Sequence, residues 1–281
     1  MSSPAFALEH LEARRVLLDV LDALASHLDA IIIVGAQAVY LRTEDRLLGY
    51  QAFTTDADLV IDPARLGGMP PLADAMTLGG FLSSGEPGVW EARLTRPGMT
   101  GTIVVPVDLI VPEQAARGAG RRAARLPGEH GKTTTRKARG LEGALVDHSL
   151  LTVAALEPDD PRHHTVKVAG TAALLVAKLH KIGERLDAPG RLLAKDAGDI
   201  YRLLSQAEPA AMAANLEALL DHTLSAEPTG AALDYAAALF RTPRSPGIGL
   251  AIAALDGILP APTITTFLTA YCQTLLQALG H

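Results

Sequence analysis

Three aspartates lie in apolar segments that are predicted to be strands, where aspartate is rare. Asp56 and Asp58 are separated by one residue within residues 54–61, and Asp108 lies within residues 104–111. Because side chains alternate along a strand, Asp56 and Asp58 share one face, with Cα atoms about 6–7 Å apart. Buried charges are costly unless they are paired or bind a metal, and carboxylates on a rigid face suit Mg²⁺, which keeps substrate phosphates among its ligands. The three acids therefore predict a shared magnesium site.

Each acid also has a simpler interpretation. A pair of aspartates one residue apart is common in turns and at exposed strand edges, and Asp108 could be an ion-paired strand residue. A junction upstream favours the site, because a predicted strand ends at Gly35 and a predicted helix follows it. Glycine permits close backbone approach, and the N–H groups at the start of a helix can bind a phosphate.

A second set of charged residues lies in the helical half of the sequence. Lys178 stands among apolar residues of a predicted helix, so its ammonium should reach solvent or meet an anion. A triphosphate is one such anion, and Asp199 on the next helix, on the same face as Asp196, is another. Nucleotide binding and a salt bridge between helices therefore both stay open. Lys181 and Arg185 are secondary candidates for phosphate contacts.

The charge of the chain is unevenly distributed. Its net charge is −6, yet residues 117–139 hold eight basic residues and one acid, a net of +7 that leaves −13 for the rest. Such asymmetry can indicate an anionic partner, although glycines and a proline in the segment allow an exposed, mobile loop instead. The predicted RNA contacts of this segment are Arg121, Arg122, Arg125, Lys132, Arg136 and Lys137.

Composition narrows the class of protein. The 281 residues are 48% hydrophobic and 20% charged, which is typical of a folded protein with a large core. The single cysteine, Cys272, excludes an internal disulfide framework and a cysteine-rich metal site. No apolar run approaches the roughly 20 residues of a membrane span, and the first residues do not resemble a signal peptide. We therefore expect a soluble cytoplasmic protein without a membrane partner.

The elements that position these residues form two predicted domains. We expect an α+β domain over residues 1–168 and an all-helical domain over residues 169–281, where prolines separate at least five helical stretches. In the first domain the pattern predicts helices over 6–28, 36–42 and 71–80, and strands over 30–34, 53–61, 89–94, 103–111, 150–156 and 165–168.

This order of motifs resembles the nucleotidyltransferase fold of DNA polymerase β. In that superfamily a strand, G-[GS] and a helix are followed by two aspartates one residue apart in an apolar strand, and by a third acid on a neighbouring strand. The matching positions are Gly35, Asp56, Asp58 and Asp108, with Ala36 where glycine or serine is usual, so that only backbone N–H groups can bind phosphates there. The resemblance implies a polymerase β-like catalytic domain with a mixed sheet, and a nucleotide bound beside Gly35, Ala36, Thr55 and Lys178.

The helical half is similar to the AbiEii/MenT family of toxin nucleotidyltransferases, in which a lysine-bearing helix precedes a K/R-D-x-x-D-hydrophobic-Y helix. Residues 174–185 and 195–204 carry this similarity, and the whole resemblance runs from about residue 31 to residue 204. It implies a magnesium-dependent toxin that transfers nucleotides from a nucleoside triphosphate to an RNA acceptor, with the tRNA 3′ end as the leading candidate, and a cognate antitoxin protein. The implied catalytic residues are Asp56, Asp58, Asp108, Lys178 and Asp199.

Regulation and two rival functions complete the expectations. Some relatives are silenced by phosphorylation of a hydroxyl beside the aspartate pair, a position that Thr54 and Thr55 offer here. A nucleotidyltransferase of the antibiotic-modifying type would use the same acids on a small molecule, without the basic segment. A non-catalytic binding protein would keep the fold and use its acids as structural ion pairs.

Overall fold

The computed structural model describes residues 8–43, 54–96, 101–117, 122–186 and 194–281. The chain forms two compact units. We call residues 1–38, 51–138 and 148–168 the sheet unit, and residues 39–50, 139–147 and 169–281 the helical unit. The boundary therefore falls within helix α2 (Gly35–Arg42), whose first residues belong to the sheet unit and whose last residues belong to the helical unit.

The sheet unit is built on an eight-stranded sheet in which the strand order is β3-β4-β5-β2-β1-β8-β7, and β6 pairs with β5. The sheet is mixed, because β1 is antiparallel to β2 and parallel to β8, while β2 is parallel to β5. The strands are β1 (Ile31–Val34), β2 (Ala57–Ile61), β3 (Leu82–Ser83), β4 (Val89–Leu94), β5 (Ile103–Pro112), β6 (Arg136–Ala138), β7 (His148–Ala154) and β8 (His163–Ala169).

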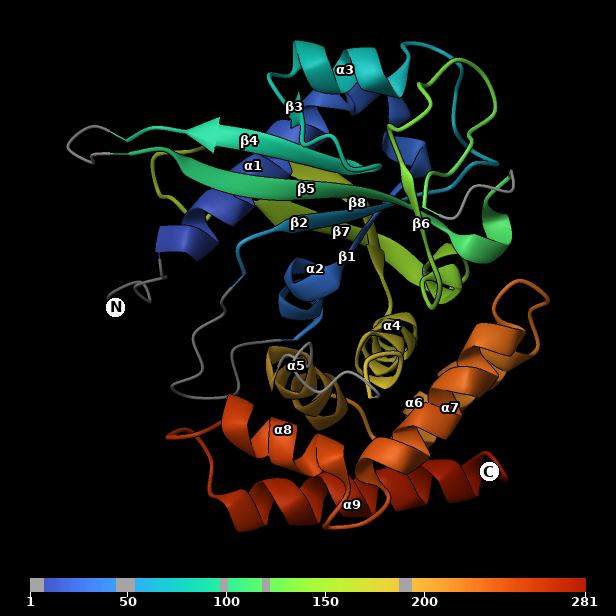
Figure 1. The fold of residues 1–281 in the computed structure, drawn as a ribbon. Coiled ribbons are helices and arrows are strands. Elements are labelled where there is room, and N and C mark those ends of the chain that lie inside the picture. Colours follow the sequence, from blue (N-terminus) through green and yellow to red (C-terminus); the bar gives the residue numbers. More distant parts are fainter. Residues whose placement is uncertain (1–7, 44–53, 97–100, 118–121, 187–193) are drawn as a thin grey trace. The chain divides into compact units, whose positions relative to one another are not determined.

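Strand β1 lies between β2 and β8, and all four of its residues are buried. A run of four β-branched aliphatic residues suits this position, because a strand covered on both faces has no polar side. Helices α1 (Leu8–Ala23) and α3 (Leu72–Leu78) lie together against the sheet (Figure 1), and α1 packs on β2 and β5. The start of α2, directly after β1, is therefore carried by the best-buried strand.

Several predicted elements have different ends in the structure. The predicted helix over 6–28 is wrong at its end, because α1 ends at Ala23 and residues Ala25–Ala30 form a 3-10 turn in which the His27 ring donates to the Pro70 carbonyl at 2.8 Å. The strand predicted over 53–61 begins only at Ala57, and Phe53 lies outside the described residues. The strand predicted over 89–94 is confirmed. The strand predicted over 103–111 is also present, and it ends one residue later, at Pro112.

The helical unit contains α4 (Thr171–Gly183), α5 (Ala194–Ser205), α6 (Pro209–Leu220), α7 (Ala226–Phe240), α8 (Pro246–Ala254) and α9 (Ala261–Ala278). Prolines stand in the first turns of α6, α8 and α9, where a missing N–H costs nothing. Helix α4 packs on α5 and α7, and α6 packs on α9. The carboxylate of Asp147 accepts a hydrogen bond from the Ala173 N–H at 3.0 Å and so caps the first turn of α4.

The α+β class is confirmed, with a mixed sheet and a helical C-terminal region (Figure 1). Short 3-10 turns at Glu113–Ala115 and Glu142–Leu145 complete the described elements. None of the helices in the described ranges has the length and apolar character that crossing a bilayer requires.

Candidate functional site

The strand register places two of the predicted acids side by side. Asp58 of β2 is the register partner of Val34 on one side and of Asp108 on the other. Neighbouring strands lie about 4.8 Å apart, and directly paired residues point to the same face, so Asp58 and Asp108 occupy adjacent positions on one face. Both residues are only half-buried. The sheet unit therefore presents two neighbouring carboxylates from its centre.

Gly35 lies against the carboxylate of Asp58. Its φ of 70° is in the left-handed region, and a Cβ built at this position would lie 2.0 Å from Asp58 Oδ2. Glycine is thus required both for the backbone conformation and for the space. Because α2 begins here, the Asp58 carboxylate sits at the end of a helix where the backbone N–H groups favour negative charge.

Asp56 precedes β2 and is held by its neighbour. The Thr54 hydroxyl donates to Asp56 Oδ1 at 2.5 Å, and Thr54 is fully buried. Thr55, by contrast, is exposed. Of the two threonines predicted as phosphorylation sites, Thr55 is therefore the one that solvent reaches.

Gln37 anchors the backbone at Asp56 from the first turn of α2. Its side-chain amide donates to the carbonyls of Asp56 at 3.1 Å and Ala13 at 2.9 Å, and its oxygen accepts from Arg14 Nε at 2.9 Å. Arg14 is buried and also donates to the Ala154 carbonyl, and burial lowers the pKa of Arg14 to about 10. Sequence reasoning missed both residues, although a glutamine two positions after Gly35 in an apolar helix was a usable signal.

Arg136 pairs with the third predicted acid. Strand β6 runs parallel to β5 with Arg136 opposite Ile110, two residues beyond Asp108 and on the same face. Arg136 Nη2 lies 2.6 Å from Asp108 Oδ2, and the two side chains are 31% and 22% exposed. Arg136 was predicted to contact RNA; in the structure its guanidinium pairs with Asp108, and its contact with RNA stays a prediction.

Residues 122–124 of the basic segment are hydrogen-bonded to β6 and to the residue before it. The Lys137 N–H donates to the Arg122 carbonyl at 2.7 Å, and the Ala124 N–H to the Thr135 carbonyl at 3.1 Å. Arg122 lies 3.8 Å from Glu86. Arg121 falls outside the described residues. The exposed basic residues of the described segment are Arg117, Arg122, Arg125, Lys132 and Arg139, and Arg139 pairs with Glu227.

In the helical unit, Lys178 forms the salt bridge that was one of its two predicted interpretations. Its Nζ lies 2.9 Å from Asp196 Oδ1 and 2.6 Å from Asp199 Oδ2, and Lys178 is only 4% exposed. Lys181 Nζ lies farther away, 3.6 Å from Asp196. The structure thus brings Lys178 together with both acids of α5, and its contact with a nucleotide stays a prediction.

Burial and charge act in opposite directions on this cluster. Burial alone would lower the pKa of Lys178, but the charges of Asp199 and Asp196 outweigh it and raise that pKa above its usual value. Burial would raise the pKa of Asp196, but Lys178 and Lys181 hold it below its usual value. For Asp199 burial prevails and raises the pKa. Within the described part of the chain, Asp196 Oδ2 and Asp199 Oδ1 are buried without a hydrogen-bond partner.

The acids of the sheet unit suit a magnesium ion by chemistry and by position. Carboxylate oxygens are the ligands that Mg²⁺ prefers, and Asp58 and Asp108 are adjacent. Across the described ranges, however, no three His, Cys, Asp or Glu side chains converge as a formed metal site. The carboxylates of Asp56 and Asp108 are engaged by Thr54 and Arg136. A cation shared by all three acids would therefore bind at a carboxylate that already carries the Arg136 guanidinium on Oδ2.

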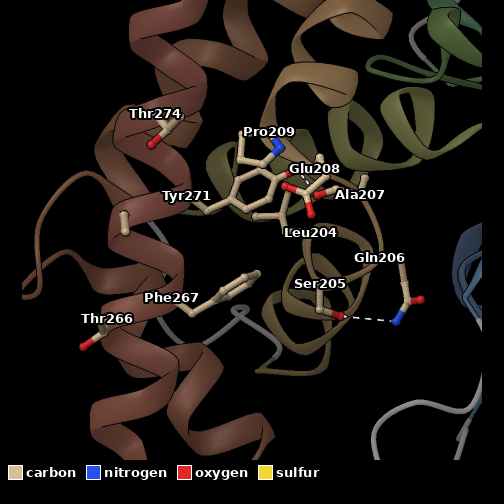
Figure 2. A pocket seen from close by; sticks show the side chains of 11 residues that line it. Leu204, Ser205, Gln206, Ala207, Glu208, Pro209, Thr266, Phe267, Tyr271 and Thr274 are labelled. Carbon is tan, nitrogen blue, oxygen red and sulfur yellow. Dashed lines mark hydrogen bonds between the residues drawn. The ribbon is translucent and has the colours of Figure 1, made fainter.

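A cavity of about 450 Å³ lies elsewhere in the helical unit, between residues 204–209 and α9 (Figure 2). The Tyr271 hydroxyl donates to the Ala207 carbonyl at 2.7 Å, and burial together with the charge of Glu208 raises the pKa of Tyr271 to about 12. The ring of Phe267 lies beside it, with centroids 5.7 Å apart. None of the predicted site residues is among those that line this cavity.

Comparison with models of protein families gives no match, and no curated protein is similar to the chain.

Proposed function

We propose that this chain is a magnesium-dependent nucleotidyltransferase that acts on an RNA acceptor. The observation that carries the proposal is the junction of Gly35, Asp58 and Asp108. A carboxylate packed on the first glycine of a helix stands directly beside a second carboxylate on the neighbouring strand. This arrangement offers oxygen ligands for a cation next to backbone N–H groups for a phosphate, which are the two requirements of phosphoryl-group chemistry.

Each residue has a distinct role in the proposed reaction. Asp56 and Asp58, with Asp108 as the third ligand, hold the cation, and the N–H groups at the start of α2, from Gly35 and Ala36 onward, bind the phosphates. When bound, Mg²⁺ supplies positive charge that stabilises the attacking and leaving oxygens. The acceptor hydroxyl oxygen forms a bond to the α-phosphorus, the bond to pyrophosphate breaks, and Asp108 accepts the hydroxyl proton.

The basic segment supports a polyanionic acceptor rather than a small molecule. Four exposed basic residues, Arg117, Arg122, Arg125 and Lys132, belong to a segment whose backbone is hydrogen-bonded to the strand that bears Arg136. Lysine and arginine in such a position neutralise phosphates and release counterions, which favours nucleic acid. The resemblance to the AbiEii/MenT family adds the tRNA 3′ end as acceptor, a cognate antitoxin as partner, and the cytoplasm as the place of action.

Lys178 and Asp199 complete the catalytic set that the resemblance implies. In this structure Lys178 and Asp199 are partners and Lys178 is only 4% exposed, so a contact of Lys178 with a triphosphate requires this cluster to open. Thr55 is the residue that we propose for inhibitory phosphorylation, because Thr54 is buried on Asp56.

The deciding experiment incubates the protein with each labelled nucleoside triphosphate, Mg²⁺ and total RNA. We expect labelled RNA with the wild type, and at least a hundredfold slower labelling with Asp58→Asn, roughly the loss that follows removal of one electrostatic group of an active site. The matched control is Asp62→Asn, which changes an acid just beyond the same strand, where Asp62 pairs with the exposed Arg65.

Three outcomes would contradict the proposal. Equal labelling by Asp58→Asn would show that the acids are not catalytic. Labelling of an added aminoglycoside but not of RNA would select the antibiotic-modifying alternative. No transfer from any triphosphate to either acceptor would select the non-catalytic binding protein.

A further inference from the structure

The Arg136 side chain can separate from Asp108 while strand β6, which carries Arg136, keeps its place. Strand β6 is pinned by close packing, since a Cβ at Gly88 would lie 2.4 Å from the Arg136 nitrogen and 2.7 Å from the Leu109 carbonyl oxygen. The guanidinium, by contrast, reaches Asp108 through a single Nη2–Oδ2 contact and is 31% exposed. Rotation of the side chain alone would therefore break the pair.

The position of this pair distinguishes it from an ordinary surface ion pair. Asp108 stands directly beside Asp58, and Asp56 lies two residues before Asp58 on the same chain segment. Carboxylates at neighbouring positions repel one another, and a positive charge beside them offsets this repulsion. Arg136 supplies one such charge to Asp108, and a divalent cation would supply more.

A guanidinium and a divalent cation cannot both use Asp108 without repelling each other. Arg136 occupies Oδ2 of Asp108 at 2.6 Å, and no three carboxylates among the described residues converge on a common point. If the Arg136 guanidinium turns the Asp108 carboxylate away from Asp56 and Asp58, this pairing also explains why the three carboxylates do not converge. The acid cluster would then be closed to a cation until Arg136 moves.

We propose that Arg136 is a positioning residue that competes with the divalent cation for Asp108. This inference rests on the proposed function, because it takes the three acids as the cation site. When the cation binds, the guanidinium leaves Asp108, and its N–H groups become available to a phosphate of the incoming substrate, a geometry to which arginine is suited. Cation binding is then weak in the protein alone and strengthened by the arrival of a phosphate-bearing substrate.

The test measures the affinity of the nucleotide-free protein for Mn²⁺ by titration calorimetry and by the electron paramagnetic resonance signal of the unbound ion. We expect Arg136→Gln to bind Mn²⁺ roughly tenfold more tightly, since removing one positive charge from beside a dication in a water-like medium has about this effect. Arg136→Lys keeps the charge and should resemble the wild type. Arg93→Gln, which removes an exposed arginine paired with Glu91 at 3.0 Å, is the matched control and should also resemble it.

The outcomes separate this inference from the proposed function. Thermal unfolding of each variant first establishes that it is folded. Unchanged or weaker Mn²⁺ binding by Arg136→Gln, together with lost binding by Asp58→Asn, would overturn the role of Arg136 alone. Mn²⁺ binding that Asp58→Asn leaves intact would show that the cation lies elsewhere, and both proposals would then be wrong.

Discussion

The two units each pair a basic residue with aspartates, but in opposite environments. In the sheet unit, Arg136 meets Asp108 through one contact, and both side chains are partly exposed. In the helical unit, Lys178 is buried between Asp196 and Asp199 and contacts both within 3 Å. A basic residue and aspartate therefore form a pair that can exchange partners in the sheet unit. In the helical unit they form a buried cluster, which we call the locked cluster, that cannot do so without a large cost.

This difference indicates which pair can take part in chemistry. Breaking a buried ion pair leaves an uncompensated charge in the interior, whereas an exposed pair is replaced by water at little cost. A catalytic acid must be able to meet a substrate or a cation, which Asp108 can do by releasing one contact. The comparison thus predicts that Asp108 can exchange its partner readily, whereas a change of partner at Lys178 costs much more stability.

The largest expected effect is on Lys178. We expect Lys178→Met to lower the free energy of unfolding by about 3–5 kcal/mol, because it leaves two buried carboxylates without their cation. Urea unfolding measures this. The control is Lys181→Met, since Lys181 is 34% exposed and farther from Asp196, so its loss should stay below about 1 kcal/mol. A stable Lys178→Met protein with weakened nucleotide binding would instead place Lys178 in the nucleotide site.

The penalty of Lys178→Met should depend on pH. In the wild type, burial would raise the pKa of Asp196, but Lys178 and Lys181 hold it below its usual value. Its contribution to stability is therefore present above pH 4 or so and is lost as the pH falls through the folded-state pKa. Without Lys178, burial raises the pKa of both acids, so the variant gains stability as the pH falls from neutral towards 5.

Urea unfolding of both proteins at pH 5, 7 and 8 measures this second prediction. The difference in unfolding free energy should be smaller at pH 5 than at pH 8. A constant difference would mean that the two carboxylates are not responsible for the destabilisation, and the locked cluster would lose its electrostatic explanation.

A substitution at Gly35 tests the candidate site of the sheet unit. Gly35→Ala places a Cβ against the Asp58 carboxylate and forces alanine into a positive φ, which by itself costs about 1–2 kcal/mol. Gly80→Ala is the matched control, because Gly80 has a φ of 85° but open space around its Cα. We expect Gly35→Ala to lose more stability than Gly80→Ala and to lose nucleotide transfer as well. Equal losses with transfer retained would show that the contact with Asp58 is unimportant.

The smallest expected effect is on Arg136. Arg136→Gln should change the free energy of unfolding by less than about 1 kcal/mol, since it removes a partly exposed single-contact pair. Thermal and urea unfolding beside Arg93→Gln measure it. A loss as large as that of Lys178→Met would abolish the contrast between the two units.

The sequence predicts the local part of this structure well. Strand β1 follows from four consecutive aliphatic residues, and the junction at Gly35 from the glycine after them. The positions of Asp58 and Asp108 on apolar strands also follow from the pattern, whereas Asp56 precedes β2. The adjacency of Asp58 and Asp108 is a different matter, because it depends on the parallel pairing of β2 with β5 across about fifty residues. Periodicity within a segment carries no information on such a register.

The partners of Arg136 and Gln37 could not be predicted for the same reason. Arg136 lies 28 residues from Asp108 and reaches it only because β6 adds to the sheet beside β5. Gln37 bonds to segments 24 and 19 residues away. For Lys178 the two interpretations differed only in which anion was nearby, and the packing of α4 on α5 supplies two aspartates.

The Gln37 side chain has a consequence for how the site can be observed. Both protons of its amide group point at carbonyl oxygens of other segments, and the residue is 1% exposed. These protons should exchange slowly with deuterated solvent and give a resolved pair of side-chain signals in a nitrogen-15 spectrum, unlike those of surface glutamines. Their exchange rate reports the opening of the contact between α1 and the chain at Asp56, without any substrate or cation being present.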